Sequence, residues 1–402
     1  MIKIGDLQID KFYLGDKSDA KIYLGDVKVW PKEEEPSETY PYAFQRVSRG
    51  GSAYTVDCNS TSSNTITSGD TQSGLGNSDA GSSTSDKTPV SVVFGDCCQS
   101  INDHACYGWT YLTSVTISDN VTSLGSYSFF NAYRLEHLKI GSGITQINQS
   151  YTFGYVGTSA STKPDLDLSK DVGLSVGKNV FSRCYFNNVI FPKNCTLSSN
   201  SFSYCSASTL SFRSGTKISD VNSYSSVFYN CNISNIDLNG VTLIGNYAFS
   251  YISGFTSITI PPSVTTFGAY AFTSVSGLNS VTIDYDSNAT FGGGCQFSGS
   301  SITSLTIGSH PTSIGNSMFT NCTKLTTLVI PSNISSINNY AFSGCTGLTS
   351  ITVHSTTPPT LGYEAFNNTN DCPIYVPPES VDAYKAASRW SSYASRIQAI
   401  PT

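Results

Sequence analysis

The chain has 402 residues, of which 12% are charged, and its formal net charge is −6 at pH 7. Charged residues usually make up about a quarter of a soluble protein, so we expect a nearly neutral surface rich in hydroxyl groups. Only 22 lysines and arginines are spread over the chain, which argues against nucleic acid as a partner because a phosphate-binding face needs clustered cations.

Residues 1–30 contain one short motif twice. Residues 12–16 have the sequence Phe-Tyr-Leu-Gly-Asp and residues 22–26 the sequence Ile-Tyr-Leu-Gly-Asp, and the Gly-Asp pairs are typical of turns between short strands. A unit of this size buries too little apolar surface to be stable alone, so we expect an N-terminal β anchor that docks on a partner. The side chains expected at that contact are Phe12, Tyr13, Leu14, Ile22, Tyr23, Leu24 and Trp30.

Two segments of different composition follow the anchor. Residues 31–38 are acidic and bracketed by prolines, which predicts a linker. Residues 39–88 are rich in Ser, Thr and Gly, and their composition leaves open a small β element or an irregular segment. The opening residues lack the features of a secretion signal, and no apolar run reaches the roughly 18 residues of a membrane span. We therefore expect synthesis in the cytoplasm and no membrane span.

Short apolar runs recur from residue 89 onward, and their ends are spaced 21 to 28 residues apart, most often 23. Such a period is typical of a solenoid, in which each repeat buries its apolar edge by stacking on its neighbours. The fold class predicted for residues 89–376 is a mainly β solenoid, a leucine-rich-repeat array of about 12–13 coils with a period of 22–24 residues. The runs end at Phe94, Ile117, Ile140, Leu168, Phe191, Phe212, Leu238, Ile260, Ile283, Ile307, Ile330, Val353 and Val376.

Each repeat is expected to supply a strand, a turn, a second apolar edge and an aromatic plug. In the strand around residues 303–307, Leu305 and Ile307 should point inward and the intervening hydroxyl residues outward. Five cysteines share one place in the repeat, three residues after a phenylalanine, where coils about 4.8 Å apart would stack them as a ladder of reduced, buried side chains; disulfides are the alternative. The ladder is Cys184, Cys205, Cys231, Cys322 and Cys345.

Residues 377–402 change character. Val381, Tyr384, Ala387, Trp390 and Tyr393 recur at helical spacing. This pattern predicts an amphipathic cap helix that covers the open apolar face of the last coil, as solenoids require.

The outward strand positions are charged or amide-bearing in the first half of the array and almost only Ser and Thr in the second. Two interpretations stay open: such residues suit any exposed strand face, or the polar first half and the tyrosines of its loops bind a surface glycan by hydrogen bonding and aromatic stacking. The candidate ligand surface is His137, Lys139, Tyr151, Tyr155, Asp165, Asp167, Tyr185 and Asp237.

No catalytic residue, cofactor site or metal site is predicted. The four histidines are isolated in the sequence, without the spacings that place two ligands on one metal. The neighbouring carboxylates Asp165 and Asp167 invite a calcium hypothesis, but no further oxygen donors lie nearby in the sequence.

The repeat pattern resembles the BspA-like class of bacterial leucine-rich repeats. It is carried by Leu-Thr-Thr-Leu-Val-Ile-Pro at residues 325–331, Ile334 to Ile337 and Ala-Phe-Ser-Gly-Cys at residues 341–345. The ending, from Ile374 to Ile400, is similar to the C-terminal cap of such proteins from gut Bacteroidales. The resemblance implies the fold and leaves the ligand open, because the class includes cell-surface adhesins and proteins of unknown role.

The duplicated opening looks like the short N-terminal segments of phage tail and fibre proteins. This resemblance implies a non-enzymatic virion appendage, a tail-fibre-like protein for host attachment and receptor binding. It would dock on other virion proteins through residues 1–30 and present the solenoid to a host surface glycan or protein. The alternatives are a BspA-like adhesin on the bacterial cell surface and a purely structural virion decoration; a homotrimer is expected by analogy with fibres alone.

Overall fold

The computed structural model describes residues 91–95, 98–160, 162–169, 173–219 and 225–401, together with the backbone of the strands that lie between residues 2 and 90. Two compact units are present, residues 1–40 and 41–402. In the first unit, β1 (Ile2–Ile4) pairs antiparallel with β2 (Leu7–Ile9), and β3 (Ile22–Leu24) pairs antiparallel with β4 (Val27–Trp30).

The predicted anchoring contacts fall outside this description. Phe12, Tyr13 and Leu14 are not among the described residues, and the side chains of Ile22, Tyr23, Leu24 and Trp30 are not described either.

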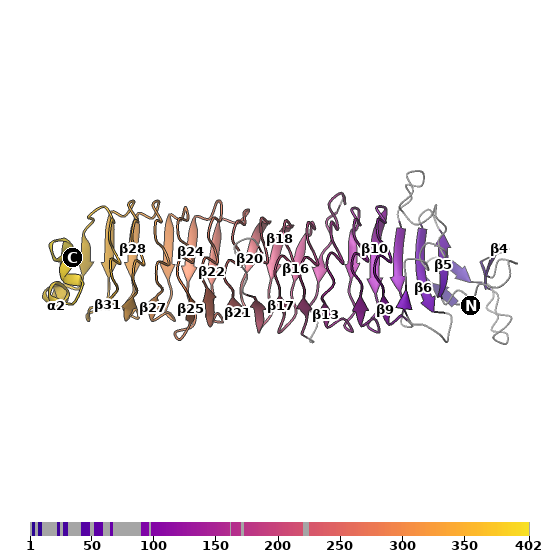
Figure 1. Ribbon diagram of the computed structural model, residues 1–402, viewed down its shortest axis with the longest axis horizontal. Coiled ribbons are helices and arrows are strands. Elements are labelled where there is room, and N and C mark those ends of the chain that lie inside the picture. The colour runs from indigo at the N-terminus through magenta and orange to yellow at the C-terminus, as the bar shows by residue number, and fades with distance from the viewer. Residues whose placement is uncertain are drawn as a thin grey trace. The chain divides into compact units, whose positions relative to one another are not determined.

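The second unit is a parallel β solenoid in which each coil gives one strand to a front sheet and one short strand to a back sheet (Figure 1). The front strands are β5 (Tyr42–Ser48), β6 (Ser52–Cys58), β8 (Val90–Phe94), β10 (Leu112–Ile117), β12 (His137–Lys139), β14 (Leu166–Asp167), β16 (Asn188–Ile190), β18 (Ser206–Ser211), β20 (Asn232–Asp237), β22 (Ser257–Ile260), β24 (Ser280–Ile283), β26 (Ser304–Ile307), β28 (Thr327–Ile330), β30 (Ser350–Val353), β32 (Ile374–Val376) and β33 (Ile397–Ala399). The back strands are β7 (Thr65–Ile66), β9 (Ser100–Ile101), β11 (Ser123–Leu124), β13 (Gln146–Ile147), β15 (Ser175–Val176), β17 (Thr196–Leu197), β19 (Thr216–Ile218), β21 (Val241–Ile244), β23 (Thr266–Gly268), β25 (Thr290–Gly292), β27 (Ser313–Ile314), β29 (Ser336–Ile337) and β31 (Thr360–Leu361). The predicted solenoid of about 13 coils is confirmed.

Strand alternation sets which side chains reach the core. In β22 the side chains alternate between exposed and buried, because successive residues of a strand point to opposite faces of the sheet. The sheet begins with a hairpin, in which β5 pairs antiparallel with β6, and β6 then pairs parallel with β8. All later pairings in the solenoid are parallel, as expected when one coil separates neighbouring strands.

The front sheet is interrupted at two places. Neither β20 and β22 nor β26 and β28 pair with each other. We call these two interruptions the first and second seams. The back sheet runs without a break from β13 to β25, so it passes behind the first seam.

A column of phenylalanine rings fills the core of eleven successive coils, with 4.9 to 5.9 Å between the centroids of neighbouring rings. Most neighbouring rings are nearly parallel, as offset stacking favours. This phenylalanine spine crosses both seams unbroken. Its members are Phe129, Phe153, Phe181, Phe202, Phe228, Phe249, Phe272, Phe297, Phe319, Phe342 and Phe366.

The five cysteines of the predicted ladder are free and buried beside this spine. Each thiol donates a hydrogen bond to the carbonyl of the spine phenylalanine one coil earlier. For example, the Cys205 Sγ lies 2.8 Å from the Phe181 oxygen and the Cys231 Sγ 2.8 Å from the Phe202 oxygen. The cysteine side chains therefore link neighbouring coils, because each thiol is hydrogen bonded to a backbone carbonyl of the preceding coil.

Most turns that lead from a back strand to the next front strand hold two residues with positive φ, four positions apart, whereas the turn before β20 has only Asn230. Tyr151 (φ 56°) and Tyr155 (φ 61°) are one such pair, and Tyr340 (φ 56°) and Gly344 (φ 76°) are another. Glycine and asparagine tolerate this left-handed conformation best. We call the two places the first and second left-handed turn positions.

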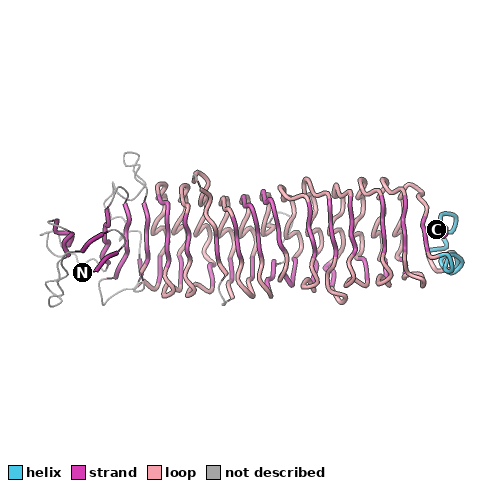
Figure 2. Tube along the Cα trace, turned by 180° about the vertical axis from the view of Figure 1, so that it is seen from behind, coloured by secondary structure: helices cyan, strands magenta, loops and turns pink. Residues whose placement is uncertain are grey.

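The C-terminal segment departs from the single cap helix expected over residues 377–402. It consists of the 3-10 helix η1 (Pro378–Ser380), the α-helix α2 (Val381–Ala386), the 3-10 helix η2 (Trp390–Arg396) and the strand β33, and it holds the only helices seen in the described residues (Figure 2). The helix ends because Ala387 is extended and Arg389 is left-handed (φ 64°). The backbone then returns to pair β33 parallel with β32, so a strand as well as a helix covers the last coil.

Candidate functional site

Charged and amide side chains occupy outward positions of four front strands between β12 and β20, namely β12, β14, β16 and β20. Leu138 is in register with Leu166, so Lys139 lies beside Asp167 and His137 beside Asp165 on neighbouring strands. The residues in register with these pairs on the following strands include Asn188 on β16 and Asp237 on β20. We call the exposed side chains of these strands the polar face.

Asp165 organises the middle of the polar face. Its Oδ1 accepts hydrogen bonds from the Asn187 side chain at 3.0 Å, the Asn188 backbone N–H at 3.0 Å and the Asn188 side chain at 2.9 Å. Hydrogen bonds to an ionised acceptor are stronger than neutral ones. The carboxylate therefore fixes both asparagine side chains in an orientation that presents polar atoms to solvent.

Two clefts border Asp165. The first has a volume of about 350 Å³ and is lined by His137, Lys139, Lys163, Asp165 and Asp167 among others. The second has a volume of about 240 Å³ and lies against Asp165, Asp167 and Asn188. Four of the predicted surface residues, two at β12 and two at β14, thus line one hollow of the front sheet and include side chains of both charge signs.

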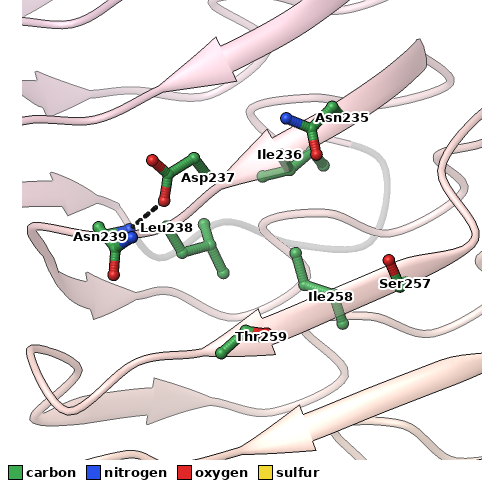
Figure 3. A pocket seen from close by; sticks show the side chains of 8 residues that line it. All are labelled: Asn235, Ile236, Asp237, Leu238, Asn239, Ser257, Ile258 and Thr259. Atoms are coloured by element: carbon green, nitrogen blue, oxygen red, sulfur yellow. Dashed lines mark hydrogen bonds between the residues drawn. The ribbon is translucent and has the colours of Figure 1, made fainter.

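A third cleft, of about 400 Å³, opens at the first seam (Figure 3). Asn235, Asp237 and Asn239 line one side, and Ser257 and Thr259 line the other. The Asp237 carboxylate accepts a hydrogen bond from the Asn239 backbone N–H at 3.0 Å. Because the two strands do not pair, this cleft offers backbone polar groups in addition to side-chain amides and hydroxyls.

The predicted tyrosines divide between two places. Tyr185 adjoins the polar face, because the Lys163 ammonium lies 5.2 Å from its ring centroid and also donates a hydrogen bond to the Gly157 carbonyl at 2.9 Å. Tyr151 and Tyr155 occupy the left-handed positions of one turn and line none of the three clefts. The structure therefore does not bring the eight predicted residues together in one site.

Lys163, Asn187 and Asn239 lie beside the strands of the polar face, line its clefts and were not among the eight predicted residues. The position of Asn239 could have been predicted from the sequence, because it comes two residues after an aspartate at the end of a front strand. Asp237 accepts a hydrogen bond from the N–H of Asn239, and Asp167 accepts one from the N–H of Ser169 in the same way, which is the Asx-turn that Asp favours. Lys163 carries no such signal, because it lies in the long repeat between Ile140 and Leu168, whose extra residues have no counterpart in the other coils.

Within the described residues, no group of three or more His, Cys, Asp or Glu side chains is placed to hold a metal ion. The helices in the same part of the chain are too short or too polar to cross a membrane.

The fold defines a class, the leucine-rich-repeat solenoids with a β strand in every coil. The family model of the BspA type leucine rich repeat region matches residues 85–162, 174–295 and 289–386. The chain therefore belongs to the BspA-type leucine-rich-repeat family, as the sequence resemblance predicted.

Solved structures similar to this chain include a leucine-rich repeat protein from Bacteroides ovatus ATCC 8483, with 19% identity, a TM-score of 0.45 and coverage of 90% of this chain and 98% of that chain. A leucine rich cell surface protein from Faecalibacterium prausnitzii A2-165 has 18% identity, a TM-score of 0.34 and coverage of 92% and 99%. The pneumococcal vaccine antigen PcpA has 11% identity, a TM-score of 0.29 and coverage of 95% and 99%. No curated protein matches the chain.

Proposed function

We propose that this protein is a non-enzymatic adhesin of the bacterial cell surface that holds a glycan or protein of a host surface on its polar face. Membership of the BspA-type family supports the adhesin over the virion appendage. The virion interpretation depends on residues 1–30, whose predicted contact side chains lie outside the described part of the chain.

The observation that carries the proposal is the hollow around Asp165. An extended solenoid presents a long open surface, and here the charged and amide groups gather on a few strands while later strands present Ser and Thr. Charges of both signs within one hollow favour a partner that is itself polar and hydrogen bonding, because complementary charges confer specificity. Asp165 holds neighbouring amides in place, which lowers the conformational entropy lost on binding.

The test is binding of the full chain to an array of host and bacterial glycans and to a panel of immobilised extracellular-matrix proteins. A polar-face variant combines Lys139→Glu with Asp167→Lys. The control combines Thr282→Glu with Thr306→Lys, which places the same charges at equivalent outward positions of β24 and β26.

We expect the wild-type chain to bind at least one probe, the control to bind it equally, and the polar-face variant to bind it about tenfold more weakly or less. Absence of binding by the wild type, or equal binding by all three proteins, rejects the polar face as the adhesive surface.

Location is tested separately. Antibodies against the solenoid should label intact cells of the source bacterium, and protease added outside should remove the label. Recovery of the protein in purified virions instead would favour the appendage.

A further inference from the structure

A second surface runs along the turns, apart from the polar face. Six aromatic side chains from successive coils form a row on the turn side of the first half of the solenoid, and Arg183 fills the one coil that lacks an aromatic ring. The rings are Tyr107, Phe130, Tyr155, Tyr204, Tyr229 and Tyr251. We call this row, with Arg183, the aromatic rail.

The rail is continuous from coil to coil. The centroids of Tyr107 and Phe130 are 5.5 Å apart, and those of Phe130 and Tyr155 are 5.3 Å apart. Arg183 lies over both Tyr155 and Tyr204, at 5.5 and 4.7 Å. The contacts then continue at 5.6 Å from Tyr204 to Tyr229 and at 5.6 Å from Tyr229 to Tyr251.

Packing of the core does not explain these rings. Tyr107, Tyr204 and Tyr251 are 46%, 40% and 43% exposed, so their burial stabilises the fold only in part. Many of their contacts are edge-to-face, with interplanar angles of 78° for Tyr204 with Tyr229 and 63° for Tyr229 with Tyr251. Edge-to-face packing leaves ring faces that the neighbour in the rail does not cover.

The backbone conformation of three rail tyrosines is a second indication that they have a role other than folding. Tyr155, Tyr204 and Tyr251 occupy the second left-handed turn position, with φ of 61°, 58° and 59°. A left-handed conformation costs about 1 kcal/mol or more for a residue with a bulky side chain. Other coils place glycine or asparagine there, as at Gly344 and Asn321. Residues held in a disfavoured conformation with an exposed side chain point to a role other than folding.

The rail has no free backbone edge to offer a peptide strand. The N–H of Tyr155 donates to the Ser182 carbonyl at 3.0 Å and that of Tyr204 to the Tyr229 carbonyl at 2.8 Å, so the turn backbones are already paired from coil to coil. Addition of a partner strand depends on unpaired N–H and C=O groups. Binding here must therefore use ring faces, phenol hydroxyls and the single guanidinium of Arg183.

From these observations we propose that the aromatic rail binds an extended, neutral or weakly acidic polysaccharide. Pyranose rings offer C–H faces that stack on aromatic rings, and their hydroxyls pair with phenol groups. The solenoid repeats about every 4.8 Å, close to the length of one sugar unit in an extended chain, so successive units meet equivalent groups. The rail lies outside the three clefts of the polar face, and this inference does not depend on the function proposed for that face.

The test is affinity electrophoresis of the full chain in gels that contain hydroxyethylcellulose, xylan or glucomannan. The rail variant combines Tyr204→Asn with Tyr251→Asn, since asparagine occupies the same turn position in other coils. The matched control is Tyr340→Asn, an exposed tyrosine in a left-handed conformation outside the rail. Thermal unfolding followed by circular dichroism verifies that all three proteins are folded.

We expect at least one polysaccharide to retard the wild type and the control equally, and the rail variant to bind about tenfold more weakly or less. Failure of all three polysaccharides to retard the wild type overturns the proposal, as does equal retardation of the folded rail variant. Loss of self-association in the rail variant by analytical ultracentrifugation, without a change in retardation, would instead make the rail an interface between copies of this chain.

Discussion

The guanidinium of Arg183 lies 4.7 Å from the ring centroid of Tyr204, which belongs to the next coil of the solenoid. Arg183 lies over Tyr155 on the preceding coil as well, so one side chain joins the aromatic rings of the two coils on either side of its own. A cation over an aromatic face is attracted by the negative potential of that face.

Replacement of Arg183 by alanine should therefore lower the free energy of unfolding by about 1 kcal/mol, because two cation–π contacts near the surface are lost, one to the exposed Tyr204 and one to the half-buried Tyr155. Urea unfolding followed by circular dichroism measures the change. Arg213→Ala is the control, since Arg213 is exposed and makes no cation–π contact with any ring among the described residues. Equal effects of the two substitutions would contradict the contribution of the rings.

The phenylalanine spine should be the most sensitive part of the core. Phe249 is fully buried and stacks between Phe228 at 5.1 Å and Phe272 at 5.0 Å. Phe249→Ala should destabilise the solenoid by about 3 to 5 kcal/mol, because it removes buried surface and leaves a cavity. Thr259→Ala, at an outward position, should change the same urea transition little. A small effect at Phe249 would show that the neighbouring rings close the gap.

The C-terminal cap should depend on Trp390. Its Nε1 donates a hydrogen bond to the Pro359 carbonyl at 2.7 Å, and its ring packs on Tyr384 with 4.9 Å between centroids. Trp390→Ala should cost about 3 to 5 kcal/mol and increase hydrogen exchange first in the last coils. Ser391→Ala, at the exposed neighbouring residue, is the control. Loss of exchange protection spread evenly over all coils would argue against a local cap.

Alkaline pH should weaken the fold through its buried thiols. Burial raises the pKa of the Cys195 thiol from 9.0 to about 12. Between these values the unfolded chain releases the proton and the folded chain keeps it, so the contribution is complete below pH 9 and is lost as pH rises toward 12. The free energy of unfolding should fall across this window, and Cys195→Ala should make the fall shallower. Identical slopes for both proteins would exclude Cys195 as a contributor.

The sequence period predicted the strands closely because alternation and burial act locally. The apolar runs predicted to end at Ile117 and Ile260 end as strands at those residues, and the run ending at Phe212 closes one residue after β18. The cap could not be predicted in the same way, because the helical spacing of Tyr384 and Trp390 is also satisfied by a short helix, a left-handed residue and a 3-10 turn.

The candidate site was predicted only in part. Outward positions follow from alternation, which placed Lys139 and Asp167 on one face. The rail depends instead on where a residue lies relative to the second left-handed turn position, and a list of loop tyrosines does not contain that information. Part of the rail has a sequence signal, a tyrosine four residues after the first left-handed position, as in Tyr151 with Tyr155 and Tyr247 with Tyr251.

The two seams change how neighbouring coils are joined to each other. Phe228 stacks on Phe249 across the first seam at 5.1 Å, and Phe297 stacks on Phe319 across the second at 5.4 Å, while the front strands at these places make no bonds to each other. At both seams the back strands still pair, β21 with β23 and β27 with β29. The coils on either side of a seam are therefore joined by the core and the back sheet, and a ligand that bridged the first seam would add a connection on the front side that the strands themselves do not make.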